Sequence, residues 1–295
     1  MVIGLDVGGT NIKGVLIDGR KIVARIKIAT KSRTDKNMLV GQIFDCINNL
    51  KDRISKIEKI GIAIAGPIDF EKQQVLNPPN LVALRGLKLG KLIRDRFGIK
   101  TIIDHDVNCF VLAEAILGAG KNYKSVFGIT LGTGVGGGMV INKKIYHGAH
   151  GSSGEVGHMT IEKNGRRCGC GNKGCLEPYI CDAGIKQIAK EIFKKQIDSL
   201  RVFDDLAKKG DERAIKLYET VGKYLGIGLA NVVDTINPEV IVVGGGIMRA
   251  GKFILAPAKK EMKKNILSQG AKKTKIFKSK LGKFAGAIGA TLLNL

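Results

Sequence analysis

One histidine and three cysteines lie close together in the middle of the chain, at the spacing H-x9-C-x-C-x4-C. They are His158, Cys168, Cys170 and Cys175. Zinc prefers a closed tetrahedron of imidazole and thiolate ligands, and one histidine with three cysteines is such a set. Glycines alternate with the cysteines, and glycine allows the tight backbone folding that three ligands from one loop require. The spacing predicts a structural Zn²⁺ site, with a disulfide framework as the alternative.

Two carboxylates flank this cluster: Glu155 lies three residues before His158, and Glu177 lies two residues after Cys175. Carboxylates and an imidazole suit a ligand with many hydroxyl groups, because each oxygen must find a partner when water leaves. We interpret the segment from Glu155 to Glu177 as a substrate-binding wall that the metal shapes. A surface position is the alternative for Glu155.

A glycine turn follows the first apolar run of the chain, in the sequence Asp6-Val7-Gly8-Gly9-Thr10. Consecutive backbone N–H groups that no side chain blocks form a nest for phosphate oxygens, and Thr10 adds a hydroxyl donor. Lys13 places an ammonium group nearby, and the Asp6 carboxylate suits Mg²⁺. The alternative is an ordinary tight hairpin.

Two further glycine turns follow apolar runs, at residues 132–138 and 244–246. Neither matches the dinucleotide or P-loop spacing, and each alone could be an ordinary turn. Three such turns after three predicted strands together indicate nucleotide binding. The residues expected to contact the nucleotide in these two turns are Thr133, Gly134, Gly245 and Gly246.

Asp106 follows a predicted strand and begins an apolar helix, directly after His105. A carboxylate in this place is either a helix N-cap or a general base. As a base, it would orient a hydroxyl group and accept its proton while the oxygen attacks phosphorus. Asp104 could serve as the cap instead. His147 and His150 are interpreted as structural or surface residues.

The elements that position these residues form a repeated pattern. Twice an apolar run meets a glycine turn and reverses, about 125 residues apart, which predicts a duplicated α/β architecture with a central cleft. The first copy is an antiparallel meander, and its second run follows at once after the turn. The second copy is expected to reverse into a strand that starts at Met139. We expect a small domain at 1–110, completed by a C-terminal helix at 283–295, and a large domain at 111–282.

Composition narrows the function classes. The chain has 295 residues, 44% of them hydrophobic, and no apolar run of membrane-spanning length. Asp6 interrupts the first apolar run, so no signal peptide is predicted and a cytoplasmic location is expected. The formal net charge is +23, and ten basic residues lie between Lys259 and Lys283. Nucleic-acid binding is nevertheless not favoured, because this stretch has few aromatics and matches no nucleic-acid motif. A solvated lysine surface, or one that attracts a polyanionic cosubstrate, is preferred.

Together these motifs resemble the ROK family of repressors, open reading frames and sugar kinases. Residues 6–10 are similar to the first phosphate motif of the family. Residues 131–139, continuing through 148–158, are similar to its long signature. Residues 155–158 match the family's E-x-G-H, and residues 168–177 match its C-x-C-G-x-x-G-C-x-E. The resemblance covers essentially the whole chain.

The resemblance implies a two-domain actin-like (ribonuclease H-like) sugar-kinase fold, with ATP and Mg²⁺ and a hexose as substrate. It implies a homodimer, with a tetramer as a further possibility. It makes Asp106 the base and places Gly66 in the loop against the sugar. The residues that it implies as contacts of sugar hydroxyls are Glu155, His158 and Glu177, and His158 would bind zinc through its other ring nitrogen.

One position departs from the family pattern. The family commonly has N-D-x-N around the base, whereas this chain has His105-Asp106-Val107-Asn108. A sugar contact therefore changes from an amide to an imidazole, which leaves the identity of the hexose open. We expect phosphorylation of the 6-hydroxyl of glucose. An N-acetylmannosamine or N-acetylglucosamine kinase and a fructokinase are alternatives. A sugar-responsive repressor is a remote alternative, because the first predicted strand begins at Val2, where no DNA-binding domain precedes it.

Overall fold

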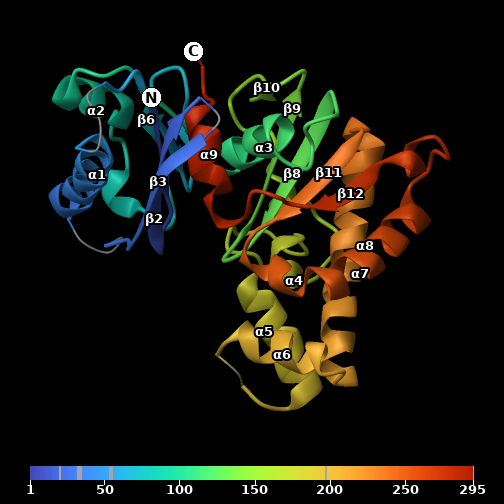
Figure 1. Cartoon of the computed structure of the whole chain (residues 1–295). Helices are drawn as coiled ribbons and strands as arrows, with labels where there is room; N and C mark the ends of the chain where they lie inside the picture. Colours follow the sequence, from blue (N-terminus) through green and yellow to red (C-terminus); the bar gives the residue numbers. More distant parts are fainter. Residues whose placement is uncertain (20, 32–34, 53–55, 197, 295) are drawn as a thin grey trace. The chain divides into compact units, whose positions relative to one another are not determined.

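Two five-stranded sheets with the same order of strands form the framework of the molecule. In the computed structural model, the first sheet has the order β3-β2-β1-β4-β7 and the second has the order β10-β9-β8-β11-β12 (Figure 1). In each sheet the earliest strand is central, the next two lie on one side of it, and the last two lie on the other. The common order confirms the predicted duplication of an α/β unit. The strands of the first sheet are β1 (Val2–Val7), β2 (Asn11–Asp18), β3 (Lys21–Ala29), β4 (Lys59–Ile64) and β7 (Thr101–His105). Those of the second sheet are β8 (Ser125–Leu131), β9 (Val135–Ile141), β10 (Lys144–Tyr146), β11 (Val240–Gly244) and β12 (Lys275–Lys278).

The structure describes residues 1–19, 21–31, 35–52, 56–196 and 198–294. The chain divides into two compact units: Met1–Lys121 with Met139–Ser153 and Lys280–Leu295 make the first unit, and Asn122–Gly138 with Gly154–Ser279 make the second. The first boundary thus falls after Lys121 instead of near residue 110, because the helix that Asp106 begins packs within the first unit. The short segment Met139–Ser153 also belongs to the first unit, which the sequence did not predict.

The helices are distributed over both units. Those of the first unit are α1 (Lys36–Lys51), α2 (Leu89–Phe97), α3 (Asp106–Ile116) and α9 (Ala285–Thr291). Those of the second unit are α4 (Glu177–Ile180), α5 (Asp182–Phe193), α6 (Leu200–Lys208), α7 (Glu212–Ile236) and α8 (Gly251–Asn265). A two-stranded hairpin of β5 (Ile68–Asp69) and β6 (Gln74–Val75) completes the first unit. Along the described ranges, no helix is both long and apolar enough to cross a membrane.

The second predicted reversal begins earlier than expected. The sequence placed the returning strand at Met139, but β9 starts at Val135 and includes the glycines at 136–138. The turn itself is therefore confined to residues 132–134, where the Gly132 N–H donates to the Gly134 carbonyl at 3.0 Å. Because glycine has a low strand propensity, the sequence did not indicate that residues 136–138 belong to the strand.

The first sheet has a helix layer on each face. Along β2, Leu16 packs in a cluster with α1, whereas Val15 and Ile17 pack with Ala113 of α3 and Ile288 of α9. This alternation is the period of two by which a strand directs successive side chains to opposite faces. Figure 1 shows the C-terminal helix α9 beside the strands that begin the chain. The expectation that this helix packs back onto the N-terminal part is therefore confirmed.

Glycines let α9 approach the sheet closely. A Cβ atom on Gly61 of β4 would lie 1.7 Å from the Ala290 carbonyl oxygen, and one on Gly4 of β1 would lie 2.0 Å from that of Ala287. Because these oxygens belong to helix backbone, an added methyl group could fit only if the whole helix moved. The close contact of α9 with β1 and β4 therefore requires glycine at both positions.

We expect Gly61→Ala to lower the free energy of unfolding by more than about 2 kcal/mol, because overpacking a rigid interface costs this much. Gly41→Ala is the matched control, because a Cβ atom at this α1 position would meet nothing within 4 Å. In a helix interior, alanine in place of glycine should leave stability unchanged or raise it by up to about 1 kcal/mol. Urea unfolding of both variants measures the difference. Equal stabilities would contradict the packing argument.

Candidate active site

The first glycine turn joins β1 to β2, and an ion pair lies beside it. Asp6 and Lys13 face each other in the antiparallel register, and Lys13 Nζ lies 2.7 Å from Asp6 Oδ2. Asp6 is only 8% exposed. Burial raises the pKa of Asp6, the Lys13 ammonium opposes this rise, and the nearby Asp106 carboxylate adds to it. A buried carboxylate beside an ammonium group and exposed backbone N–H groups can hold a phosphate–cation pair.

Other loops of the first unit surround this turn. The Gly8 N–H donates to the Asn11 carbonyl at 3.1 Å, which closes the turn and leaves Thr10 exposed. A Cβ atom on Gly9 would lie 2.7 Å from the Cβ atom of Asn80, so glycine is needed for the close approach of that loop. Gly66 has a φ of 142°, in the region that favours glycine, and lies against Pro78.

Asp106 is the first residue of α3, and His105 occupies the N-cap position. The Val107 N–H donates to Asp106 Oδ1 at 2.8 Å, and His105 Nδ1 lies 3.6 Å from the same oxygen. The Asp106 side chain is 33% exposed. Within the described residues, Asp106 Oδ2 has no hydrogen-bond partner. This oxygen can therefore accept a proton or a hydrogen bond from a ligand.

A second carboxylate at the same junction is buried and fully partnered. Asp104 Oδ1 accepts hydrogen bonds from the His105 N–H at 2.7 Å and from Asn108 Nδ2 at 2.9 Å. His147 Nε2 lies 2.8 Å from Asp104 Oδ2. Asp104 therefore does not cap the helix, as was considered for it: no side chain of the described residues caps α3, and Asp104 instead accepts the N–H of the N-cap residue His105 and the side-chain amide of Asn108. The interpretation of His147 as structural agrees with the contact, but its partner was not foreseen.

In the second unit, Glu177 contacts the second glycine turn. The Val135 N–H donates to Glu177 Oε2 at 2.8 Å, and a Cβ atom on Gly134 would lie 2.8 Å from the same oxygen. Glycine at 134 therefore leaves space for the Glu177 carboxylate. The last residue of the predicted sugar wall thus holds the turn that contains Thr133 and Gly134, a connection that the sequence did not show.

The segment from Glu155 to His158 packs on the glycine-rich start of β9. A Cβ atom on Gly137 would lie 2.6 Å from the Gly154 carbonyl oxygen, and one on Gly157 would lie 2.2 Å from that of Val135. Residues Val156–His158 form a short 3₁₀ turn, in which the His158 N–H donates to the Glu155 carbonyl at 3.1 Å. Glu155 is exposed, and His158 is half-buried. The close packing that Gly137 and Gly157 allow therefore fixes the backbone positions of Glu155 and His158.

The one histidine and three cysteines converge as predicted. One ligand atom from each of His158, Cys168, Cys170 and Cys175 lies within 4.8 Å of all the others. Cys168 Sγ lies 3.5 Å from His158 Nδ1, and Cys170 Sγ lies 3.8 Å from Cys175 Sγ. The alternative of a disulfide framework is excluded, because all six cysteines are free.

The loop that holds the cysteines depends on backbone turns that suit glycine. Gly171 has a φ of 98° and Gly174 a φ of 74°. A Cβ atom on Gly174 would lie only 1.7 Å from the Glu162 carbonyl oxygen. The Cys168 N–H donates to the Asn172 carbonyl at 2.8 Å, which closes the loop around the thiols. The glycines between the cysteines therefore have the role that the sequence assigned to them.

The third glycine turn lies at the end of β11 in the second unit. Gly245 has a φ of 94°, and a Cβ atom there would lie 2.1 Å from the Leu131 carbonyl oxygen at the end of β8. Gly246 has nothing within 4 Å of such an atom, so its backbone is open. The ends of β8 and β11 thus meet where the second and third turns begin. Parallel strands that end together are a common site for nucleotides.

The structure therefore forms two groups of predicted site residues. The first unit contains Asp6, Gly8, Gly9, Thr10, Lys13, Gly66, His105 and Asp106, and the second contains Thr133, Gly134, Glu155, His158, Glu177, Gly245, Gly246 and the three clustered cysteines.

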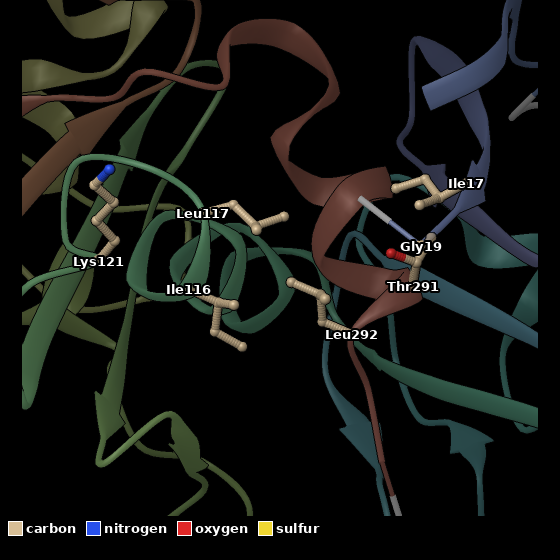
Figure 2. A pocket seen from close by; sticks show the side chains of 7 residues that line it. All are labelled: Ile17, Gly19, Ile116, Leu117, Lys121, Thr291 and Leu292. Atoms are coloured by element: carbon tan, nitrogen blue, oxygen red, sulfur yellow. The ribbon is translucent and has the colours of Figure 1, made fainter. Parts of the chain in front are cut away.

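A pocket of about 400 Å³ lies elsewhere, within the first unit (Figure 2). Its lining is mainly aliphatic, and the only charged side chain among the lining residues is that of Lys121. It is lined by Ile17, Gly19, Ile116, Leu117, Lys121, Thr291 and Leu292. None of these is a predicted site residue, and the pocket lacks the carboxylates and glycine turns that the chemistry requires. We therefore place the candidate active site at the two groups and not at this pocket.

Comparison with known proteins gives one family. A sequence model of the ROK family matches residues 2–295. A glucokinase of Thermotoga maritima is 30% identical, over 98% of this chain and 95% of its own. An N-acetyl-D-glucosamine kinase of Vibrio cholerae is 32% identical over 100% of both chains. A xylose repressor of Bacillus spizizenii is 32% identical, over 97% of this chain and 75% of its own.

A solved structure agrees with these relatives. The ROK family glucokinase of Streptomyces griseus, in complex with glucose and AMPPNP, has a TM-score of 0.86 and 28% identity, over 98% of this chain and 97% of its own. The fold is thus the two-domain actin-like fold of sugar kinases, as the resemblance implied. The match of the family model along the whole chain, together with this likeness, shows that the chain belongs to the ROK family.

Proposed function

We propose that this chain is an ATP-dependent sugar kinase that transfers the γ-phosphoryl group of ATP to the 6-hydroxyl of a hexose, with glucose as the first candidate. The observation that carries the proposal is the state of Asp106. Its carboxylate is one-third exposed at the start of α3, and Oδ1 already accepts the Val107 N–H. A carboxylate held in this way can orient a hydroxyl group and take its proton during attack on phosphorus.

The residues of the first turn supply the electrostatic part of this proposal. Gly8, whose own N–H closes the turn on the Asn11 carbonyl, would let the phosphates approach closely, and Gly9 would offer them its backbone N–H group. Lys13 and Thr10 would add an ammonium group and a hydroxyl. Asp6 would hold Mg²⁺ directly or through water, and its burial beside an ammonium group fits a site for a phosphate-bound cation. When bound, Mg²⁺ would neutralise charge on the phosphates. In the second unit, Thr133, Gly134, Gly245 and Gly246 would contact the nucleotide, and the glucokinase neighbour with AMPPNP supports ATP as the donor.

The sugar contacts in this proposal are Gly66, His105, Glu155, His158 and Glu177. The geometry of His158 supports its double role, because Nδ1 faces Cys168 and Nε2 is left for a hydroxyl group. Its four-residue cluster fits zinc. A tetrahedral ion with Zn–S bonds of 2.3 Å places two sulfur atoms about 3.8 Å apart, and a sulfur and a nitrogen about 3.6 Å apart. One sulfur–sulfur pair and one sulfur–nitrogen pair have separations of 3.8 Å and 3.5 Å, and all four ligand atoms lie within 4.8 Å of one another.

The zinc would have a structural role only. Protein ligands would take all four positions of the tetrahedron, so no site would remain for a water molecule or a substrate oxygen. Fixing His158 Nδ1 on the metal would also fix the tautomer and the direction of the ring. The metal would therefore shape the sugar wall without taking part in phosphoryl transfer.

A panel of sugars tests the proposal. We expect coupled ADP release with glucose, mannose, fructose, glucosamine and the two N-acetylhexosamines to give the highest kcat/KM with glucose. A second candidate, an N-acetylhexosamine kinase, is favoured by the Vibrio cholerae relative. A higher kcat/KM for an N-acetylhexosamine would select that candidate. Absence of ADP release with every sugar, in a protein that binds sugar, would overturn the kinase proposal and favour a regulator such as the xylose repressor.

A homodimer, which light scattering would detect as twice the 31.7 kDa of one chain, completes the proposal.

A further inference from the structure

Three carboxylates gather near the ends of β1 and β7 in the first unit. Asp6 is the next-to-last residue of β1, and Asp104 and Asp106 lie on either side of the junction between β7 and α3. All three lie near the buried Cys109 thiol. Burial raises the pKa of Cys109, and the negative charges of Asp104, Asp106 and Asp6 raise it further. Like charges this close destabilise one another unless each has a counter-charge.

Two of the three carboxylates have a basic partner within hydrogen-bond distance, whereas the imidazole nearest to Asp106, that of His105, lies 3.6 Å away. Lys13 pairs with Asp6, and the His147 imidazole lies 2.8 Å from Asp104. Asp104 is only 3% exposed, and a buried carboxylate is tolerated where hydrogen bonds and a counter-charge satisfy it. Asp106, the candidate base, thus keeps one carboxylate oxygen without a partner within the described residues. Asp6 and Asp104 are therefore satisfied by their partners, whereas Asp106 keeps an oxygen for a ligand.

The His147 ring is itself held in place from a second side. It stacks on the Phe70 ring with centroids 4.2 Å apart and an interplanar angle of 6°. Phe70 follows β5 (Ile68–Asp69) and lies four residues after Gly66, in the loop expected against the sugar. His147 follows β10 (Lys144–Tyr146), and its carbonyl accepts the Ser153 N–H at 3.1 Å. One imidazole therefore connects three segments that are distant in the sequence.

The contact acts on the backbone that carries Asp106. While Asp104 Oδ2 is paired with His147, Asp104 Oδ1 receives the His105 N–H and the Asn108 side chain. These two bonds fix the first turn of α3 on either side of Asp106. Loss of His147 would leave a buried negative charge, and that charge would draw in water or turn away from the helix start. Either change would displace the Asp106 carboxylate.

We propose that His147 is a positioning residue for phosphoryl transfer, which acts through Asp104 to fix the direction of the Asp106 carboxylate. This inference rests on the proposed function, in which Asp106 accepts the proton of the sugar hydroxyl. His147 does not itself touch the reacting atoms in this scheme. Misplacement of a catalytic group by about 1 Å costs up to about 100-fold in rate.

The test separates kcat from KM. We expect His147→Ala to lower kcat by about 10- to 100-fold, with KM for the sugar changed by less than about threefold, because the base is misdirected while the sugar contacts remain. His147→Gln keeps an N–H donor for Asp104 and should recover most of the lost kcat. Asp104→Asn in the His147→Ala background should also recover part of it, since an amide needs no counter-charge.

His150→Ala is the matched control, because His150 lies in the same loop and is exposed. It should have the wild-type kcat. Thermal unfolding of each variant shows whether it is folded, and if His147→Ala does not fold, the comparison of His147→Gln with Asp104→Asn/His147→Gln decides. For that pair we expect His147→Gln to keep most of the wild-type kcat and Asp104→Asn/His147→Gln to have a kcat lower by up to about tenfold and clearly below wild type, because one amide then replaces each partner of the pair. A wild-type kcat in folded His147→Ala, or in the double variant, would overturn the role of His147 alone. Absence of wild-type kinase activity would overturn the proposed function, and the role of His147 with it.

Discussion

Asp106→Asn is expected to lower kcat by about 10²- to 10⁴-fold while sugar binding is retained. The asparagine side chain has nearly the same shape, and its amide oxygen can still accept the Val107 N–H that Asp106 Oδ1 accepts at 2.8 Å. What the substitution removes is the ability to take a proton from the attacking hydroxyl. The loss should therefore fall on kcat and not on the dissociation constant of the sugar. Coupled ADP release gives kcat, and isothermal titration calorimetry with the sugar gives binding.

Asp45→Asn provides the control for this prediction. Asp45 lies on the exposed face of α1 in the same unit, so the substitution makes the same change of charge and shape away from the site. It should have wild-type kcat and KM. Turnover of Asp106→Asn within a few-fold of wild type would remove Asp106 from its proposed role. The contact of Asp106 with the Val107 N–H at the start of α3 would then be its only assigned role.

Local patterns in the sequence predicted those parts of the fold that depend on neighbouring residues. The helix at Leu89–Phe97 has such a local signal, because its apolar residues recur at helical spacing and a glycine follows it; Gly98 ends the helix in a left-handed conformation with a φ of 67°. The strand–glycine turn–strand repeat likewise predicted the duplicated sheet. Both signals lie within a window of about 15 residues, over which pattern and propensity add up.

Features that depend on contacts between distant segments were missed. The glycines at 136–138 were placed in a turn, because the reason for them lies elsewhere: Gly137 leaves space for the backbone at Gly154. The pairing of His147 with Asp104 joins residues 43 apart, and Glu177 reaches Val135 across 42. No local period reports such contacts. A signal was nevertheless available for the first of them, since an acid two residues before a candidate base needs a partner if it is buried.

The candidate metal site was predictable because all its ligands lie in one short segment. The spacing gave the ligand set, and the structure adds the directions of the side chains. His158 Nδ1 faces the thiols, and Glu177 accepts the Val135 N–H next to Gly134. The same loop would therefore position one group toward the sugar and another toward the nucleotide turn. Loss of the metal should therefore disturb both the proposed sugar contacts and the proposed nucleotide contacts of the second unit.

Removing one ligand of this cluster is the second large effect that we expect. Cys175→Ser should lower the zinc content from about one per chain to near zero. An ion that binds only the folded loop stabilises it by about 4 kcal/mol when its free concentration is about 1,000 times the dissociation constant. We expect a loss of unfolding free energy of about this size. We also expect activity to fall by about 10- to 100-fold, as for the loss of groups that orient metal ligands. Elemental analysis, urea unfolding and ADP release measure the three quantities.

Cys46→Ala is the matched control, because Cys46 is a buried thiol of α1 outside the cluster. It should keep the zinc and the KM values for sugar and ATP, and lose only the stability that a small cavity costs. Wild-type protein exchanged into Mg²⁺ buffer should also keep its zinc, since Mg²⁺ prefers oxygen ligands and does not compete for thiolates. Finding no zinc in the wild type, with the exposed Cys170 thiol of the cluster open to titration in the folded protein, would refute the metal site. Cys175→Ser would then behave like Cys46→Ala, since both would be ordinary substitutions of buried thiols.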